Sequence, residues 1–218
     1  MMKVLIYGAT GSIGSRITQE ARDRGHEVTA VVRNPSRTPV QEAALEVIAG
    51  DVLDKEAAAK HARGRDAVIS AVGAGIRGPA PRFDIYRGAA ESLIEALRTL
   101  GETAPRLLVV GGAGSLEVAP GVRLVDTPEF PGMFRQEALA QAEALDYYRC
   151  VTDVEWTYLS PAVLIEPGAR TGRYRTGGDA LLTDQEGSSA ISTEDYAAAL
   201  VDELETPQAI GRRLSVAY

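Results

Sequence analysis

The chain has 218 residues, of which 45% are hydrophobic and 24% are charged, and its formal net charge is -7. This composition is typical of a globular protein with a buried core, and it excludes a disordered or fibrous chain. The acidic balance argues against a surface that follows nucleic-acid phosphates, although one local basic pocket for a nucleotide stays compatible with it. We therefore expect a single domain over residues 1–218 with no nucleic-acid partner.

Cysteine and histidine are scarce in this sequence. Cys150 is the single cysteine, so neither an intrachain disulfide nor a zinc site of paired cysteines can form. The two histidines, His26 and His61, leave little material for a metal cluster or a Ser-His-Asp triad. The chain enters the apolar run at residues 4–7 without a basic leader, and no apolar stretch approaches about 18 residues. We expect a cytoplasmic protein with no metal and no membrane partner.

Hydrophobic periodicity predicts strands that alternate with helices along the chain. Strands are expected at residues 3–7, 27–32, 46–49, 67–71, 106–110, 156–160 and 213–216. Helices are expected at residues 12–24, 55–63, 85–100, 134–148 and 193–204, with Asp54 as the N-cap of the second and Ser192 or Thr193 as that of the last. This alternation implies right-handed crossovers. The predicted fold class is α/β, with a doubly wound, mostly parallel sheet of Rossmann type.

The pattern changes after Pro161, where glycines interrupt shorter segments. Small strands are expected at residues 172–175 and 180–183. We interpret residues 161–218 as the contributor of a small C-terminal extension on the substrate side. The loops at 75–82 and 117–133 are rich in proline and glycine, which is typical both of lids over sites and of variable surface loops.

A glycine-rich turn, GATGSIG, joins the first predicted strand to the first predicted helix. Glycines at such a turn allow it to be tight and bring backbone N–H groups close to a phosphate. The N-terminus of the following helix adds roughly half a positive charge. An ordinary strand-to-helix turn is the less favoured alternative, because the flanking elements match a dinucleotide site. The residues expected to bind the pyrophosphate are Gly8, Thr10, Gly11, Ser12, Ile13 and Gly14.

The end of the second strand predicts which dinucleotide is bound. A site for NAD places Asp or Glu about 20 residues after the glycines, to bind the ribose 2′-hydroxyl. Here that position is Arg33, whose guanidinium suits a 2′-phosphate, and Arg37 is a second candidate. The alternative is a solvated surface arginine. We expect NADP(H) as the cofactor, in preference to NAD(H).

Other loops at the same predicted edge supply further candidates for cofactor binding. Asp51 and Val52 follow the third strand, where a carboxylate can accept the adenine amino group; an ordinary turn residue is the open alternative for Asp51. Ala71, Val72 and Gly73 end the fourth strand, and their small size would let a ribose approach. We expect all five residues to contact the cofactor.

The sequence resembles the atypical short-chain dehydrogenase/reductase proteins in five places. These are the glycine turn, Arg33, the Gly50–Asp51 pair, the loop from Gly111 to Ser115 and residues 156–168. Within this family, the chain is similar to the NmrA-like and flavin reductase, biliverdin reductase B-like branch. The resemblance implies a Rossmann-type fold, bound NADP(H) and hydride transfer from nicotinamide to flavin or a similar planar acceptor. It also implies that Ser115 follows the fifth strand as the family's serine does, and that Pro161, Ala162 and Val163 line the nicotinamide.

The sequence departs from ordinary short-chain dehydrogenases in one respect. Those enzymes use Tyr-x-x-x-Lys, in which the cation lowers the tyrosine pKa for proton exchange with a carbonyl or alcohol. The only lysines here are Lys3, Lys55 and Lys60, all before the helix that would contain the dyad. Tyr147 and Tyr148 are expected to pack instead. Ser115 is left as the catalytic candidate, able to donate a hydrogen bond to the acceptor or carboxamide, with a simple turn residue as its alternative.

Two functions from different classes are favoured. The first is an NADP(H)-dependent oxidoreductase, a reductase of flavin, quinone or another planar small-molecule acceptor, which tolerates the missing dyad because the cofactors supply most of the chemistry. The second is a non-catalytic NADP(H) sensor of NmrA type. An epimerase or dehydratase is a third, less favoured reading, since it usually keeps the tyrosine and lysine. A monomer or homodimer suits either function, and Arg170, Arg173 and Arg175 either meet an anionic substrate or are solvated.

Overall fold

The computed structural model describes residues 1–35, 45–75 and 80–218. An eight-stranded sheet forms the centre of the described chain, in the order β10-β12-β8-β5-β4-β1-β2-β3. Neighbouring strands are parallel except β10, which pairs antiparallel with β12. The strands are β1 (Lys3–Tyr7), β2 (Glu27–Val32), β3 (Leu45–Ala49), β4 (Ala67–Ser70), β5 (Arg106–Val110), β8 (Trp156–Ser160), β10 (Arg175–Gly177) and β12 (Arg212–Ala217). The predicted doubly wound, mostly parallel sheet is confirmed.

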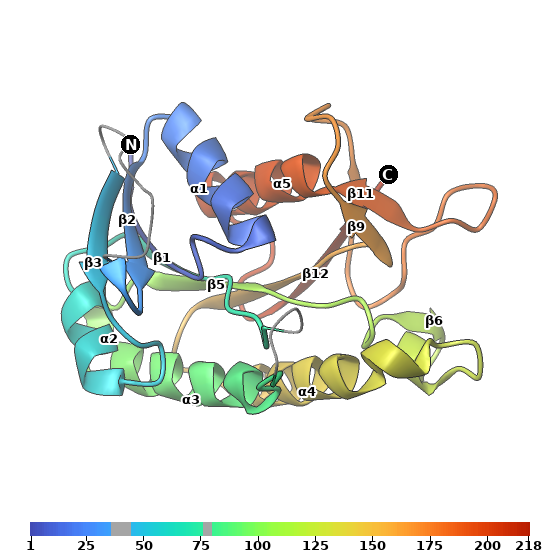
Figure 1. Cartoon of the computed structure of the whole chain (residues 1–218), viewed down its shortest axis with the longest axis horizontal. Coiled ribbons are helices and arrows are strands. Elements are labelled where there is room, and N and C mark those ends of the chain that lie inside the picture. The colour runs from blue at the N-terminus through green and yellow to red at the C-terminus, as the bar shows by residue number, and fades with distance from the viewer. Residues whose placement is uncertain (36–44, 76–79) are drawn as a thin grey trace.

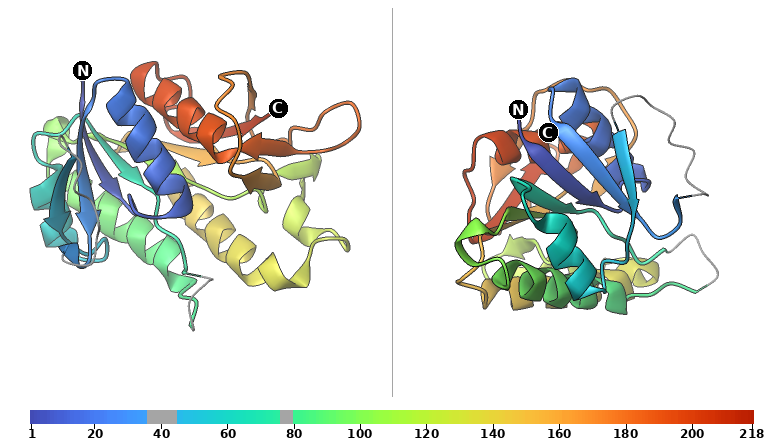
Figure 2. Two further views of the ribbon diagram at one scale, coloured as in Figure 1. Left: turned by 45° about the horizontal axis from the view of Figure 1, so that its top comes forward. Right: turned by 90° about the vertical axis from the view of Figure 1, so that its left-hand side faces the viewer.

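Helices cover both faces of the sheet (Figure 1). One face holds α1 (Ser12–Asp23) and α5 (Thr193–Glu205), and the other holds α2 (Lys55–Ala62), α3 (Asp84–Arg98) and α4 (Gly132–Arg149). The same three layers are visible in the turned views of Figure 2. Among the helices of the described residues, none is long and apolar enough to cross a membrane.

Two predicted helix caps are confirmed. The Asp54 carboxylate accepts a hydrogen bond from Ala57 N at 3.0 Å, and Ser192 Oγ accepts one from Asp195 N at 3.0 Å. Each cap satisfies a backbone N–H that has no partner inside its helix. The start of α2 and the start of α5 are therefore fixed by single side chains that the sequence identifies.

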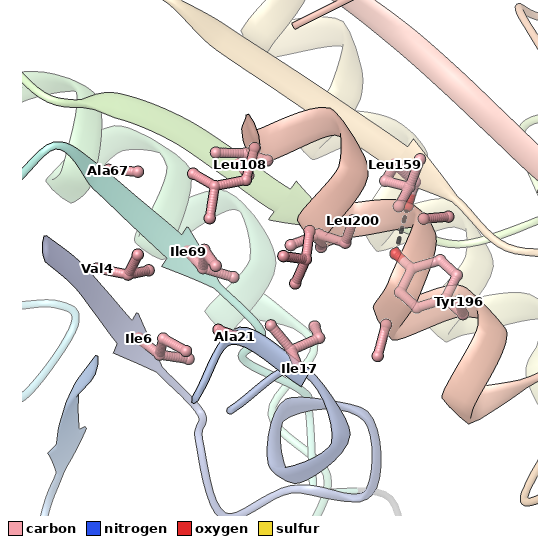
Figure 3. Packing of buried hydrophobic residues seen from close by; sticks show 14 of the residues in the cluster. Val4, Ile6, Ile17, Ala21, Ala67, Ile69, Leu108, Leu159, Tyr196 and Leu200 are labelled. Carbon is pink, nitrogen blue, oxygen red and sulfur yellow. Dashed lines mark hydrogen bonds between the residues drawn. The ribbon is translucent and has the colours of Figure 1, made fainter. Parts of the chain in front are cut away.

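The hydrophobic core lies on both sides of the sheet. On the face that holds α1 and α5, Ile17 and Leu200 pack on strand residues such as Ile6 and Ile69 (Figure 3). On the same face, Tyr196 Oη donates a hydrogen bond to Leu159 O at 2.7 Å. On the opposite face, α3 and α4 cover a second hydrophobic cluster, in which Trp156 is buried. A parallel sheet needs cover on both faces, and these two clusters supply it.

The C-terminal third differs from the prediction in detail. The predictions of small strands at residues 172–175 and 180–183 are wrong. The strand in this region is β10, which begins only at Arg175, and Ala180 forms no more than an isolated bridge with Glu117. The cause is Asp195, whose carboxylate accepts from Thr171 N (2.8 Å) and Gly172 N (2.7 Å), so these amides do not pair with a strand. Gly172 has φ +67°, which also breaks an extended run.

Several short elements surround the ends of the main strands. A hairpin of β6 (Glu117–Ala119) and β7 (Val122–Arg123) and a 3₁₀ turn (Leu124–Asp126) lie within the long loop before α4. Strands β9 (Leu164–Glu166) and β11 (Ala190–Ser192) pair in parallel beside α5, and a further 3₁₀ turn (Gly101–Thr103) precedes β5. Unlike these pieces, α5 and β12 belong to the main layers.

Candidate functional site

The strand order reverses direction at β1, and this defines the candidate site. From β1 the chain continues to β2 and β3 on one side, whereas β4, β5 and β8 lie on the other. Open α/β sheets bind ligands beyond the carboxyl ends of their strands at such a switch point. The loops that follow β1 and β4 meet there, since Ala71 N donates to Tyr7 O at 2.9 Å.

The loop after β1 has the shape of an anion cradle. Gly8 has φ +77°, and a Cβ atom there would overlap the carbonyl oxygen of Ala71. A Cβ at Gly14 would overlap the carbonyl oxygen of Gly8, so both glycines are required by close backbone contact. Gly11 N donates to Gly8 O at 3.0 Å, and Gly11 is the N-cap of α1.

The N-terminus of α1 is suited to a phosphate. Among the described residues no side chain caps it, and its first turn contains no acidic residue. Thr10, Gly11 and Ser12 are exposed, Ile13 is half-buried and Gly14 is buried. Free N–H groups and the positive end of the helix dipole therefore face solvent at this point. The residues present fit the pyrophosphate of a dinucleotide.

Arg33 and Asp51 lie on the β2 and β3 side of the switch point. Arg33 is exposed and directly follows β2. Asp51 Oδ1 accepts from Leu53 N at 3.0 Å, which makes Asp51 a turn residue with a carboxylate that is still exposed. The Val52 side chain is buried in the core. Arg37, the second predicted contact to the 2′-phosphate, lies outside the described residues.

The loops after β4 and β8 place the remaining predicted cofactor contacts at the same edge. Ala71 and Val72 are half-buried, and Gly73 is exposed with no atom within 4 Å of a Cβ placed on it. Pro161 and Ala162 are buried, whereas Val163 is exposed, with its N–H donating to Ser189 Oγ at 3.2 Å. Their contact with a cofactor stays a prediction.

Ser115 is held by an arginine that no local sequence pattern indicates. Arg213 of β12 donates from Nη1 to Ser115 Oγ at 2.9 Å and to Ser115 O at 3.0 Å, and both residues are buried. Arg213 also pairs with Asp179 at 2.5 Å. Burial lowers the pKa of Arg213, and the Asp179 carboxylate opposes that change. Ser115 thus fastens its loop to β12, and its predicted role toward an acceptor stays a prediction.

The tyrosines near the end of α4 are packing residues. Tyr148 is buried with its ring centroid 5.6 Å from that of Trp156 and 6.1 Å from that of Tyr158. Arg87 lies over the Tyr147 ring, 4.5 Å from its centroid. Burial raises the pKa of Tyr148 far above its ordinary value, which suits a neutral core residue. The helix therefore offers no tyrosine and lysine dyad.

A polar cluster lies instead near the start of α4. The Tyr86 hydroxyl, from α3, donates to Glu137 Oε1 and accepts from Ala74 N at 3.2 Å. Burial raises the pKa of Tyr86 to about 12 and the Glu137 carboxylate adds to the rise, while Gln141 and the Ala74 N–H oppose it. Hydrophobic patterning alone does not distinguish Glu137 and Gln141 from the other polar residues of α4.

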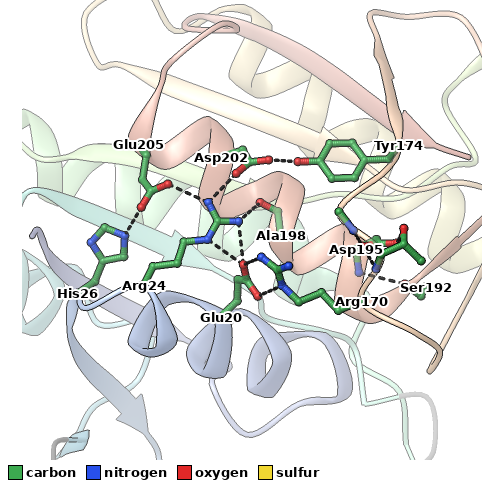
Figure 4. Close-up of polar contacts among 12 residues, drawn as sticks. Glu20, Arg24, His26, Arg170, Tyr174, Ser192, Asp195, Ala198, Asp202 and Glu205 are labelled. Carbon is green, nitrogen blue, oxygen red and sulfur yellow. Dashed lines mark hydrogen bonds and ion pairs between the residues drawn. The ribbon is translucent and has the colours of Figure 1, made fainter.

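The segment between β9 and β10 is fastened to α1 and α5 by charged groups (Figure 4). Arg170 donates to both carboxylate oxygens of Glu20, at 2.6 and 2.7 Å, and Arg24 donates to Glu20 from the other side. The hydrogen bond from Arg170 lowers the pKa of Glu20, burial opposes this and Arg24 adds to the lowering. Arg170 is thus engaged with a carboxylate of this chain.

The reversed strand order and the glycine cradle define the class: a Rossmann domain that binds a dinucleotide. A family model described as NAD(P)H-binding matches residues 8–207. The Bacillus subtilis protein YwnB, itself uncharacterised, is 43% identical over 219 residues, which span 99% of this chain and 98% of YwnB.

Two solved structures extend the comparison. A candidate NADH-flavin reductase from Streptococcus pneumoniae superimposes with a TM-score of 0.87 and 39% identity, covering 100% of this chain and 99% of that one. A candidate epimerase from Bacteroides thetaiotaomicron gives a TM-score of 0.89 and 39% identity, covering 100% and 97%. The chain belongs to the NAD(P)H-binding family, within the atypical short-chain dehydrogenase/reductase proteins.

Proposed function

We propose that the protein is an NADP(H)-dependent reductase that passes a hydride to flavin, quinone or a similar planar acceptor. The strongest support is the position of Arg33, whose exposed guanidinium directly follows β2. In proteins that prefer NAD, a carboxylate stands at this position and binds the ribose 2′-hydroxyl. The similarity to a candidate NADH-flavin reductase supports the acceptor class.

The residues at the sheet edge divide the work of binding. The N–H groups between Gly8 and Gly14 would hold the pyrophosphate, Arg33 would pair with the 2′-phosphate, and Asp51 would receive the adenine amino group. When bound, NADPH supplies the hydride. The protein then has to orient two flat rings and exclude water, which requires no tyrosine and lysine pair.

A second candidate function is a sensor that binds NADP(H) without turnover. Two observations favour it: α4 contains no lysine, and the Ser115 hydroxyl is occupied by Arg213. Both candidates require nucleotide binding, so only turnover separates them.

The experiment compares binding of NADPH and NADH to the natural protein, Arg33→Ala and a control, Arg63→Ala, at an exposed arginine just after α2. Losing a charged contact to phosphate should weaken NADPH binding by about tenfold to a hundredfold, with NADH binding unchanged. Equal NADPH binding by Arg33→Ala and Arg63→Ala would contradict the choice of NADP(H).

Turnover is measured in the same series as the loss of nicotinamide absorbance with FMN or menadione as acceptor. Acceptor-dependent loss that decreases in Arg33→Ala supports the reductase. Tight NADPH binding with no loss for either acceptor supports the sensor.

A further inference from the structure

Three polar side chains converge beside the switch point, on the side away from Arg33. They are Tyr86 on α3 and Glu137 and Gln141 on α4. In the sheet, β4 and β5 lie on one side of β1, and β2 and β3 lie on the other. A dinucleotide whose adenine end lies near Arg33 therefore directs its nicotinamide end toward the loops after β4 and β5.

The Gln141 amide lies directly against the loop after β5. A Cβ atom placed on Gly112 would overlap Oε1 of Gln141, so the glycine leaves the space that the amide fills. Tyr158 Oη donates to the Gln141 backbone oxygen at 3.2 Å, which ties this turn of α4 to β8. Gln141 is half-buried, so part of its surface is reachable from solvent.

Tyr86 connects this amide to the loop after β4, because its hydroxyl interacts with the Gln141 side chain as well as with Ala74 and Glu137. Its hydroxyl accepts from Ala74 N at 3.2 Å and donates to Glu137, four residues before Gln141 on the same helix face. Because the Tyr86 hydroxyl, the Glu137 carboxylate and the Ala74 N–H restrain one another, the cluster has a defined arrangement.

A glutamine amide is neutral and offers both a donor and an acceptor. This suits a ring carbonyl beside a reducible system, and it suits a charged substrate group less well. The Glu137 carboxylate next to it would repel an anionic group.

We infer that the Gln141 amide, which lies over Gly112, hydrogen-bonds a ring carbonyl of the hydride acceptor, and that Tyr86 and Glu137 are positioning residues that hold this amide. The inference rests on the proposed function for the identity of the acceptor class. It assigns the acceptor side of the site to α3 and α4, and it does so independently of Ser115.

The test uses Gln141→Met, which keeps the side-chain volume and removes the hydrogen-bonding groups. The matched control is Gln136→Met, at an exposed glutamine of the same helix. Binding of FMN and of menadione is titrated in the presence of NADP⁺, and NADPH binding is titrated separately. We expect Gln141→Met to weaken acceptor binding about tenfold, with NADPH binding unchanged and the control equal to the natural protein.

Tyr86→Phe tests the positioning role. Removing the hydroxyl should raise the acceptor KM several-fold with little change in kcat, because the amide remains but is less restrained. Equal acceptor affinity in Gln141→Met and Gln136→Met would overturn the inference, as would a loss of NADPH binding in Gln141→Met or no binding of either acceptor by the natural protein. Acceptor binding that depends on Gln141 without any turnover would overturn the reductase proposal and leave this inference standing.

Discussion

The two sides of the sheet edge are held in shape by different means. On the nucleotide side, Gly8 and Gly14 allow backbone atoms to meet within one short turn and against Ala71. On the proposed acceptor side, the contacts join side chains far apart in the chain: Arg213 and Ser115 are separated by 98 positions, and Tyr86 and Glu137 by 51. A backbone requirement leaves a local sequence pattern, whereas a long-range side-chain pair does not.

The largest effect is expected from breaking the nucleotide side with Gly8→Ala. The added Cβ would overlap the Ala71 carbonyl and would hold a positive φ, so we expect a loss of about 3 kcal/mol in the free energy of unfolding. NADPH binding should become undetectable, because the turn can no longer close. Chemical denaturation and a nucleotide titration measure the two effects.

Gly25→Ala is the matched control for this change. Gly25 also has a positive φ, +81°, but nothing lies within 4 Å of its added Cβ. It should lose about 1 kcal/mol from backbone strain alone and keep full NADPH binding. Similar losses in both variants would show that close contact with Ala71 is not what requires glycine at position 8.

The contact between α1 and the segment after β9 is broken by Glu20→Ala. This change leaves Arg24 and Arg170 without the buried carboxylate that they share, and we expect a cost of about 3 kcal/mol in unfolding free energy. NADPH binding should persist, and limited proteolysis should cut the segment around Arg170 faster. Gln19→Ala, at the exposed neighbour of Glu20, is the control and should behave as the natural protein. Cleavage at an unchanged rate would show that this clamp does not restrain the segment.

A smaller effect is expected in the pH dependence of the unfolding free energy, through Glu194. Burial would raise the pKa of Glu194, but hydrogen bonds from Gly168 N, Arg16 and Thr193 lower it to about 2 from 4.5. Since the folded pKa is depressed, Glu194 stabilises the fold fully above pH 4.5, and this contribution is lost as the pH falls toward 2.

Glu194→Gln should therefore flatten the dependence of unfolding free energy on pH in that window, by about 1 kcal/mol after screening by solvent. Glu186→Gln, at an exposed loop carboxyl, serves as the control. An unchanged slope in Glu194→Gln would show that the link between Gly168 and α5 contributes little to stability.

Much of the fold follows from local patterns. The alternation of strands and helices, the turn at Gly8 and the caps Asp54 and Ser192 each depend on residues close together in the chain, and the structure confirms them. The expected strand at residues 172–175 is wrong because Asp195, on α5, accepts hydrogen bonds from the amide of Gly172 and from that of the preceding Thr171. No property of residues 172–175 alone reveals that partner.

The candidate site divides in the same way. Arg33 could be placed by counting from the glycines, and the structure puts it at the end of β2. Arg213 and Gln141 could not be found, since one is a charged residue in a predicted strand and the other is one of several polar residues on an amphipathic helix. Their environment depends on the loop after β5, which the fold brings against Arg213 at Ser115 and against Gln141 at Gly112.

The fastening of residues 168–172 to α5 has a consequence for the order in which the molecule is made. Gly168 N bonds to Glu194, and Thr171 N and Gly172 N bond to Asp195, so this segment gains its partners only after a later helix has formed. The turn at Gly8, in contrast, contacts Ala71, which is only 63 residues further along the chain. Because chains emerge from the N-terminus first, the glycine turn has its partner before the segment at residues 168–172 has its own.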